Sequence, residues 1–191
     1  MGLDMYLTKK IYIGANYKHS NVKGEVNLTK GDKNEPIKIN INRISYIKES
    51  VGYWRKANQI HKWFVENIQD GKDDCGDYNV SEEKLSELLA ICKKIKNECK
   101  LKKGKIRNGQ TASPETGGKL VDNIEDGKIM TNSHIAANLL PSASGFFFGG
   151  TAYDEYYMND IDNTIEIIET LFKEKGDAKY IDGDIYYHSY W

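Results

Sequence analysis

The spacing of hydrophobic and polar positions changes along this chain, which indicates a mixture of strands and helices. Apolar and polar residues alternate in part over residues 3–13 and clearly over residues 37–42, and a period of two is typical of half-buried strands. Residues 145–150 form a compact apolar run bounded by glycines, which predicts a short buried strand. Residues 181–191 predict a last strand at the end of the sequence.

Three other segments show the spacing of an amphipathic helix: residues 54–68, 81 to about 100, and a stretch within 154–175. Ser81 stands where a helix N-cap is expected, and Gly176 is a natural end for the last helix. A shorter helix could occupy residues 132–140 before a proline. The helical segments therefore lie between the predicted strands without a regular strand–helix alternation.

Two polar segments complete the pattern. Residues 14–36, rich in Gly, Asn and Lys, predict a hairpin or loop region with one weak strand, and residues 102–128 predict an exposed insertion loop. The order of elements does not match a doubly wound parallel sheet. We expect residues 1–191 to form a single α+β domain, with an antiparallel or mixed sheet and about three helices packed on it.

Composition narrows the classes of protein that this chain can belong to. Its 27 Lys and Arg residues are balanced by 28 Asp and Glu residues, which argues against bulk coating of nucleic acid, although a local basic patch stays open. The three cysteines have neither the number nor the spacing of a disulfide framework or a zinc site. No signal peptide or membrane-spanning apolar run is evident, so we expect a cytoplasmic protein.

The segment 53–58 carries the densest set of recognition side chains. On a helix that starts at Trp54, Arg55, Asn58 and Lys62 would share one flank and could hold a phosphate or carboxylate, with Trp54 as a stacking face and Lys56 beside them. The alternative is a surface helix with solvated cations and a tryptophan that anchors it to the sheet. The second interpretation is the commoner one for such helices.

Two further groups of candidates accompany this segment. His61 falls at the centre of the apolar arc, which favours a core histidine bonded to a carbonyl or tyrosine hydroxyl over a general base. Asp154 stands at the start of the last helix, where it could act as a cap or form a binding wall with its tyrosine neighbours. The candidate binding residues are Trp54, Arg55, Lys56, Asn58, His61, Lys62, Tyr153, Asp154, Tyr156 and Tyr157.

Signals for catalysis or a bound cofactor are weak. The acidic turn at residues 70–77 could attract a divalent cation, but its spacing does not match an EF-hand, and its carboxylates should raise the pKa of Cys75. No short motif of a nucleotide-binding or hydrolytic enzyme occurs. We therefore predict no catalytic residue, metal or cofactor. The competing hypothesis is an enzyme for nucleotides or nucleic acid that brings together His61, Asp73, Asp74 and Asp154.

Several segments stand out as a set in the order of the chain: Gly2 to Leu7, the run Gly52-Tyr53-Trp54-Arg55-Lys56-Ala57-Asn58-Gln59-Ile60-His61-Lys62-Trp63-Phe64-Val65, Asp73 to Gly76, Gly145 to Gly149 and Tyr153 to Tyr157. Together they resemble a family of small phage and prophage accessory proteins. The resemblance transfers no catalytic residue.

The resemblance implies a biological context. Phage accessory proteins of this size are often inhibitors of host defence that act on a CRISPR effector or a nucleotide signal. We therefore expect a non-enzymatic counter-defence protein in the cytoplasm of the bacterial host, which binds a host protein or a phosphorylated nucleotide. A virion or assembly component is a third hypothesis, and it would require a large exposed apolar patch.

Overall fold

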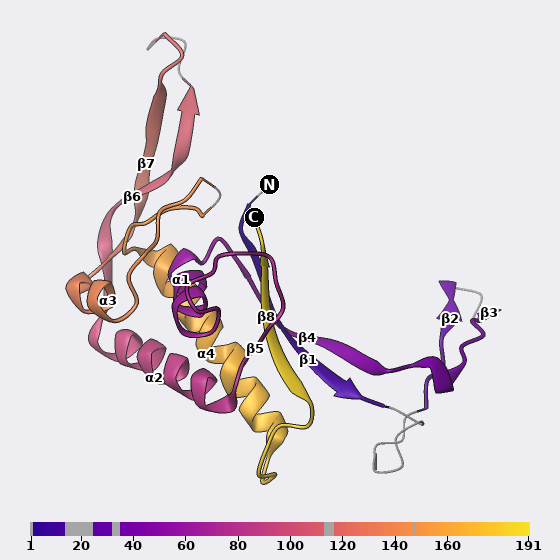
Figure 1. Cartoon of the computed structure of the whole chain (residues 1–191). Coiled ribbons are helices and arrows are strands. Elements are labelled where there is room, and N and C mark those ends of the chain that lie inside the picture. Colours follow the sequence, from indigo (N-terminus) through magenta and orange to yellow (C-terminus); the bar gives the residue numbers. More distant parts are fainter. Residues whose placement is uncertain (1, 14–24, 32–34, 113–116, 147) are drawn as a thin grey trace.

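A four-stranded antiparallel sheet forms the centre of the molecule. The computed structural model describes residues 2–13, 25–31, 35–112, 117–146 and 148–191. The strand order is β4–β1–β8–β5, made of β1 (Asp4–Tyr12), β4 (Tyr46–Arg55), β5 (Tyr78–Asn79) and β8 (Asp184–Tyr190). Asp4 pairs with Tyr190 across β1 and β8, and the two chain ends therefore lie side by side (Figure 1).

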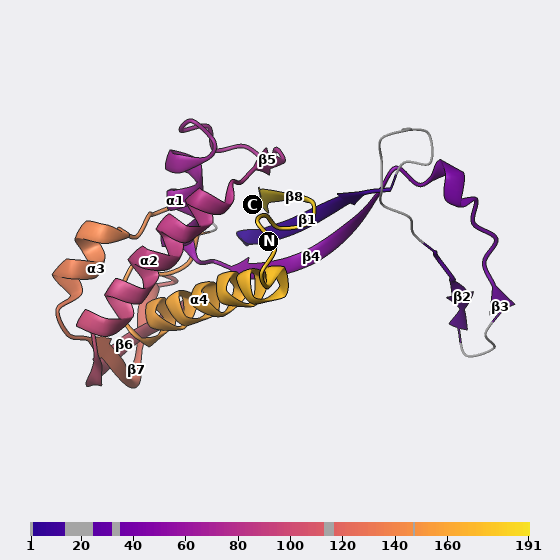
Figure 2. The same ribbon diagram turned by 90° about the horizontal axis from the view of Figure 1, so that it is seen from below.

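Four helices gather on one side of this sheet (Figure 2). They are α1 (Asn58–Asn67), α2 (Glu82–Glu98), α3 (Ser133–Leu139) and α4 (Glu155–Lys175). The predicted cap at Ser81 is confirmed, since its side chain accepts a hydrogen bond from the amide of Lys84, and α4 ends at Gly176 as expected. The chain is thus a single α+β domain with an antiparallel sheet.

Aromatic side chains join the helices to the sheet. The ring of Phe64 on α1 stacks on that of Tyr187 on β8, with centroids 3.9 Å apart. From α4, Thr164 accepts a hydrogen bond of 2.9 Å from the indole nitrogen of Trp54 on β4. These buried contacts hold α1 against β8 and α4 against β4. The candidate site lies beside the end of β4.

The predicted start of the first helix was wrong. Residues 53–55 continue β4, in which Tyr53, Trp54 and Arg55 pair with residues 6, 5 and 4 of β1, and the helix begins only at Asn58. Trp54 is buried in both interpretations, because the inner face of a strand and the apolar arc of a helix share that position. The pairing of residues 53–55 with β1 shows that they belong to a strand and not to a helix.

The segment 102–128 is not a loop but most of a regular hairpin. Strands β6 (Leu101–Ala112) and β7 (Leu120–Met130) pair over nearly their whole length and project away from the helices (Figure 1). Most of its side chains are exposed, as predicted. Ion pairs such as Lys105 with Asp126 occupy positions at which apolar residues would have indicated a strand in the sequence. The sequence therefore resembles a loop although its backbone is regular.

Two predicted strands are absent from the described residues. Residues 37–40 lie outside any strand and residues 41–43 form a short 3-10 helix, because the alternating Ile37, Ile39 and Ile41 have no sheet partner and stay exposed. Of the predicted strand at 145–150, the described residues are not in a strand; Phe146 is 95% exposed, and Phe147 lies outside the described residues.

The N-terminal loop region is described in part. Within residues 14–36, the structure shows a two-residue pairing of β2 (Thr29–Lys30) with β3 (Glu35–Pro36). Residues 14–24 and 32–34 of that prediction lie outside the described residues. Within the described part of the chain, no helix combines the length and apolar character needed to cross a bilayer.

A buried side-chain amide fixes the path of the segment that replaces the predicted strand. The nitrogen of Asn58 donates to the carbonyl oxygens of Phe148, at 3.0 Å, and Gly150, at 2.7 Å. Its oxygen accepts a hydrogen bond of 2.9 Å from the amide of Ala143. Asn58 is 2% exposed, and this network, the Asn58 clamp, therefore holds residues 143–150 against the start of α1.

We expect Asn58→Ala to lower the free energy of unfolding by about 2–4 kcal/mol, because three backbone groups lose the hydrogen bonds of a side chain that is itself buried. Chemical denaturation followed by circular dichroism measures this change. As a control, Asn138→Ala alters an exposed asparagine of α3 and should change the value by less than about 0.5 kcal/mol. A loss below about 1 kcal/mol for Asn58→Ala would show that the segment does not need the clamp.

Candidate functional site

A cleft of about 650 Å³ lies where the β6–β7 hairpin approaches the starts of α1 and α4. Its volume is in the range of small-molecule sites. Five segments contribute to it: the end of β4, the start of α1, the bulged part of β6, the glycine-rich chain before α4, and the first turns of α4. The side chains and backbone that line it belong to Arg55, Lys56, Gln59, Arg107, Asn108, Gly109, Gln110, Gly149, Gly150, Thr151, Ala152, Asp154, Tyr156, Tyr157, Asn159 and Asp160.

Three cationic side chains line this cleft. Arg55 and Lys56 are exposed and form no ion pair with any described residue. Arg107 reaches the cleft from the hairpin, and its Nε lies 2.7 Å from the carboxylate of Asp122. The two cations at the end of β4 are therefore free to meet an anion, while Arg107 is held in place by a carboxylate.

The backbone of Lys56 has an unusual conformation that sets its position. Its φ is +60°, in the left-handed region that costs a residue with a Cβ roughly 1 kcal/mol. The turn is held at both sides, since the amide of Lys56 donates to Leu3 and its carbonyl accepts from Asn58. The chain can therefore leave β4 and start α1 within two residues, with Lys56 at the edge of the cleft.

The backbone of Gly149 and Gly150 forms another wall of the cleft, next to Lys56. A Cβ at Gly149, whose φ is +84°, would lie 3.1 Å from the Cβ of Lys56. Gly150 has no atom within 4 Å of the same position, which leaves space for a ligand beside the main chain. This wall depends on the Asn58 clamp, whose amide binds the carbonyl of Gly150.

Two carboxylates lie on the α4 side of the cleft, and burial raises the pKa of both. Asp154 is the N-cap of α4, and its Oδ1 accepts from the amides of Tyr156 and Tyr157. Burial raises the pKa of Asp160 to about 6, although the amide of Gln59 donates to it at 2.9 Å. Asp160 is therefore still mostly ionised at pH 7 and becomes protonated below about pH 6, where it would repel an anion less.

Two tyrosines of α4 line the cleft, and one is buried while the other is exposed. The hydroxyl of buried Tyr157 donates to the carbonyl of Leu140 at 2.8 Å, so this side chain is part of the core. Tyr156 is exposed at the mouth, and its hydroxyl lies 3.4 Å from the carboxylate of Glu125 on the hairpin. An exposed ring beside cations suits a ligand that carries both an aromatic base and a phosphate.

The structure divides the ten candidate binding residues into two groups. Those that line the cleft are Arg55, Lys56, Asp154, Tyr156 and Tyr157. Trp54 and Asn58 are buried, and they anchor β4 and the Asn58 clamp. Lys62 faces Glu66 one turn further along α1, and the Tyr153 hydroxyl accepts from the amide of Ser142. The expected flank of Arg55, Asn58 and Lys62 does not exist, because Arg55 belongs to a strand.

His61 has the environment of a core histidine, as its place on the apolar arc predicted. It is 1% exposed, with Nδ1 2.7 Å from the hydroxyl of Tyr187 and Nε2 3.0 Å from the carboxylate of Asp73. Desolvation lowers its pKa despite the carboxylate, so the ring is neutral at neutral pH. Asp73 also accepts from the indole of Trp191, so this pair is built into the fold.

The acid residues named in the competing hypothesis do not form one site. Asp74 accepts hydrogen bonds from the amide of Gly76 and the hydroxyl of Tyr78, within its own turn. Asp154 lines the cleft, whereas neither His61 nor Asp73 does. Among the residues that the structure describes, no group of three or more His, Cys, Asp or Glu side chains could hold a metal ion.

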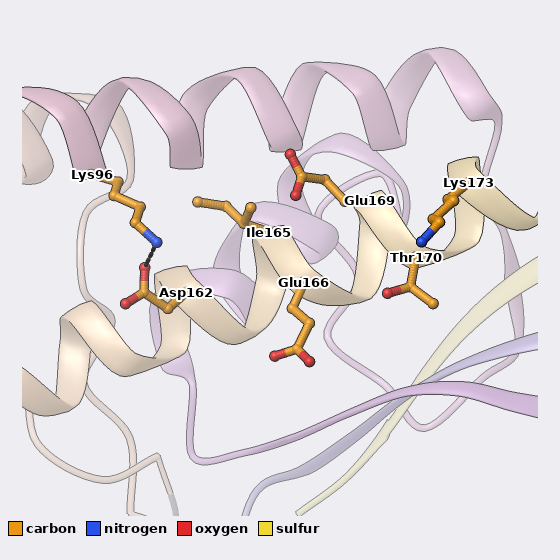
Figure 3. A pocket seen from close by; sticks show the side chains of 7 residues that line it. All are labelled: Lys96, Asp162, Ile165, Glu166, Glu169, Thr170 and Lys173. Atoms are coloured by element: carbon orange, nitrogen blue, oxygen red, sulfur yellow. Dashed lines mark ion pairs between the residues drawn. The ribbon is translucent and has the colours of Figure 1, made fainter.

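A second hollow, of about 410 Å³, lies between α2 and α4 (Figure 3). It is a less convincing binding site because three of its five charged side chains, Lys96, Asp162 and Glu169, already pair across the two helices. Figure 3 shows Lys96 reaching Asp162, at 2.8 Å, and Lys93 of α2 lies 2.6 Å from Glu169. These half-exposed ion pairs connect the helices and engage the charges that a ligand would need.

Sequence reasoning missed several residues of the cleft, namely Gln59, Arg107, Asn108, Gln110 and Asp160. Three of these residues lie on the hairpin that the sequence predicted as a loop. Asp160 is at a helical position that is usually exposed beside the apolar stripe of α4. Nothing in the local sequence links residue 107 to residue 55, so their meeting depends on the tertiary structure.

Comparison with known proteins adds no relative from which a function could be transferred. No protein-family model, curated protein or solved structure matches this chain. A function therefore has to be inferred from the chemistry of the cleft.

We expect Asp160→Asn to stabilise the protein more at pH 7 than at pH 4. The pKa of Asp160 is about 6 in the folded protein against 3.8 in an unfolded chain, so its contribution to stability is greatest at low pH and is lost as the pH rises through 6. The gain in unfolding free energy over the wild type should grow by about 2 kcal/mol between these pH values. Denaturant titrations at both pH values test this, and an equal effect at both would contradict a buried, desolvated carboxyl.

Proposed function

We propose that this protein binds a small phosphorylated ligand, such as a cyclic or linear dinucleotide, in the cleft between the hairpin and the start of α4. The observation that carries the proposal is the convergence of Arg55, Lys56 and Arg107 on one cleft of about 650 Å³. Guanidinium groups match phosphate oxygens in a two-pronged geometry, and lysine adds a point charge. A phosphate-bearing ligand would pair with Arg55 and Lys56 and could also accept from the terminal nitrogens of Arg107, whose Nε is bound to Asp122.

Other features of the cleft support a ligand with a base. The ring of Tyr156 is exposed at the mouth and offers a stacking face. The open space beside Gly150 allows close approach to the backbone. A dinucleotide combines two phosphates with two bases, and so it uses both the cations and the ring.

Binding without catalysis is the function that we favour. His61, the best general-base candidate in the sequence, is buried with both ring nitrogens engaged and does not line the cleft. Cys75 is exposed on the acidic turn, and Cys92 and Cys99 are buried in the core, so no thiol lines the cleft either. Together with the resemblance to phage accessory proteins, this supports a counter-defence protein that sequesters a nucleotide signal of the host.

An enzyme that acts on nucleotides is the second candidate, and Asp160 is the residue that favours it. A buried carboxyl whose pKa is about 6, beside cations in a cleft, has the properties of a general acid or base. The His61-centred version of this hypothesis has no support in the geometry. Only a version centred on Asp160 is compatible with the cleft.

Isothermal titration calorimetry against cyclic and linear dinucleotides tests the proposal. We expect binding by the wild-type protein and a weakening of about tenfold or more for Arg107→Ala and for Lys56→Gly, because each removes a charged hydrogen-bond donor. Glycine is the suitable replacement at residue 56, since it accepts the positive φ. Lys105→Ala, which removes an exposed cation of the same hairpin outside the cleft, is the matched control and should bind like the wild type.

The same samples separate the two candidate functions. Recovery of intact ligand after incubation supports binding alone, whereas turnover that Asp160→Asn abolishes would support the enzyme. If no dinucleotide binds while purified host defence proteins are retained by the protein, the small-ligand proposal is wrong. Equal affinities for Arg107→Ala and Lys105→Ala would also reject the cleft as the site.

A further inference from the structure

The face of the main sheet that turns away from the helices is covered with aromatic rings. Residues directly opposite each other in antiparallel strands point to the same face. Tyr6 of β1 pairs with Tyr53 of β4 and with His188 of β8, so these three rings share one face. By the same register, Tyr12 and Tyr46 share this face, and Tyr186 and Tyr190 of β8 complete it. We call these seven residues the aromatic face.

The aromatic face is open in the described part of the molecule. The helices gather on the other side of the sheet (Figure 2), and Tyr53 and Tyr190 are 44% and 57% exposed. Residues of the same strands that point to the other face, such as Trp54, are buried in the core. The exposed tyrosines lie at the two ends of the face, with Tyr53 and Tyr190 at one end and Tyr12 and Tyr46 at the other, and the core does not require them there.

The rings form two groups, in which Tyr6 and His188 are stacked and the other ring pairs are tilted or edge-on. Around Tyr6, the ring of His188 stacks at 5.0 Å, and those of Tyr53 and Tyr190 lie at 5.2 and 6.1 Å. The second group surrounds Lys10, whose Nζ lies 4.1 Å from the ring of Tyr186. Burial lowers the pKa of His188, so its ring is neutral at neutral pH.

Cations flank the rings. Arg55 stands at one end of the aromatic face, across from Asp4, and Lys48 stands near the other end, across from Lys10. Neither Arg55 nor Lys48 has an ion-pair partner among the described residues. Of the carboxylates on this face, Asp4 accepts from the Tyr53 hydroxyl and Asp77 pairs with Lys10 at 3.0 Å. One cation without an ion-pair partner thus stands at each end of the rings, Arg55 across from Asp4 and Lys48 across from Lys10, and Asp184 is a further carboxylate across from Lys10.

We infer that the aromatic face binds single-stranded nucleic acid, with bases stacked on the tyrosines and phosphates held by Lys48 and Arg55. Base stacking on aromatic side chains supplies affinity for single strands without reading sequence, and flanking cations follow the backbone. Three cations, Lys10, Lys48 and Arg55, balance the three carboxylates Asp4, Asp77 and Asp184 on this face, so stacking on the rings rather than net charge would supply most of the affinity. A discrete surface of this kind is compatible with the neutral net charge of the chain, which argues only against bulk coating.

This inference does not rest on the ligand proposed for the cleft. Arg55 belongs to both surfaces, so we leave it unchanged in the test. Variants at Tyr53, Tyr190 and Lys48 alter the aromatic face alone, because none of the three lines the cleft. Loss of nucleic-acid binding and loss of dinucleotide binding can therefore be told apart.

Fluorescence anisotropy with labelled oligothymidylate and oligouridylate of about ten nucleotides tests the inference. We expect Tyr53→Ala and Tyr190→Ala each to weaken the Kd by about tenfold, the effect of one lost stacking contact. Tyr53→Phe should bind like the wild type, because it keeps the ring and loses only the hydroxyl bond to Asp4. Lys48→Ala should lower the slope of log affinity against log salt by about 0.7.

The control is Tyr180→Ala, which removes an exposed tyrosine that lies outside the aromatic face and should leave binding unchanged. Thermal unfolding of each variant confirms that the fold is kept. Failure of the wild type to bind either oligonucleotide at low salt would overturn the inference. So would equal losses for Tyr53→Ala and Tyr53→Phe, or retention of a protein partner but no oligonucleotide by this face.

Discussion

The side-chain amide of Asn58 joins the first turn of α1 to residues 143–150, and the shape of the cleft depends on this link. Its three hydrogen bonds reach backbone groups that are 85 to 92 residues away in sequence. Because the Asn58 side chain is buried, its amide must find its partners inside the protein, and it finds them in this segment. The clamp therefore determines where the chain runs between α3 and α4, and so where Gly149 and Gly150 face Lys56.

The shape of the cleft also depends on the junction between β4 and α1. A strand points alternate residues to opposite faces, so Trp54 enters the core while Tyr53 and Arg55 point outward. The positive φ of Lys56 then turns the chain directly into α1. One short segment thus supplies a core anchor, a ring of the aromatic face and two cations of the cleft, which explains why its side chains looked so rich in recognition chemistry.

Local signals in the sequence predicted much of the fold. Ser81 and Gly176 mark helix ends through interactions with their own neighbours, and such features can be recognised without knowing the tertiary structure. The residues at 37–42 show the limit of this reasoning, because alternation of apolar residues makes a strand only when a second strand pairs with it. The hairpin at 101–130 shows the opposite case, since cross-strand charge pairs hold strands whose sequence has little apolar periodicity.

The candidate site was predictable only in part, for related reasons. Asp154, Tyr156 and the pair Arg55–Lys56 stood out because they cluster near the ends of predicted elements. Arg107 did not stand out, because its partners in the cleft come from segments that are distant from it in sequence on either side. Asn58 attracted notice as a ligand-binding amide, whereas its hydrogen-bonding capacity is used within the fold. Polar residue types alone do not distinguish between these two uses.

Backbone amide chemical shifts followed by NMR during titration with a cyclic dinucleotide test the central claim most directly. Binding in the cleft predicts the largest shifts at Asn108, Gly109, Gly149, Gly150 and Asn159, which come from three separate segments. Residues of the hollow between α2 and α4, such as Thr170, should stay unchanged. Shifts confined to that hollow, or none at any concentration, would contradict the account.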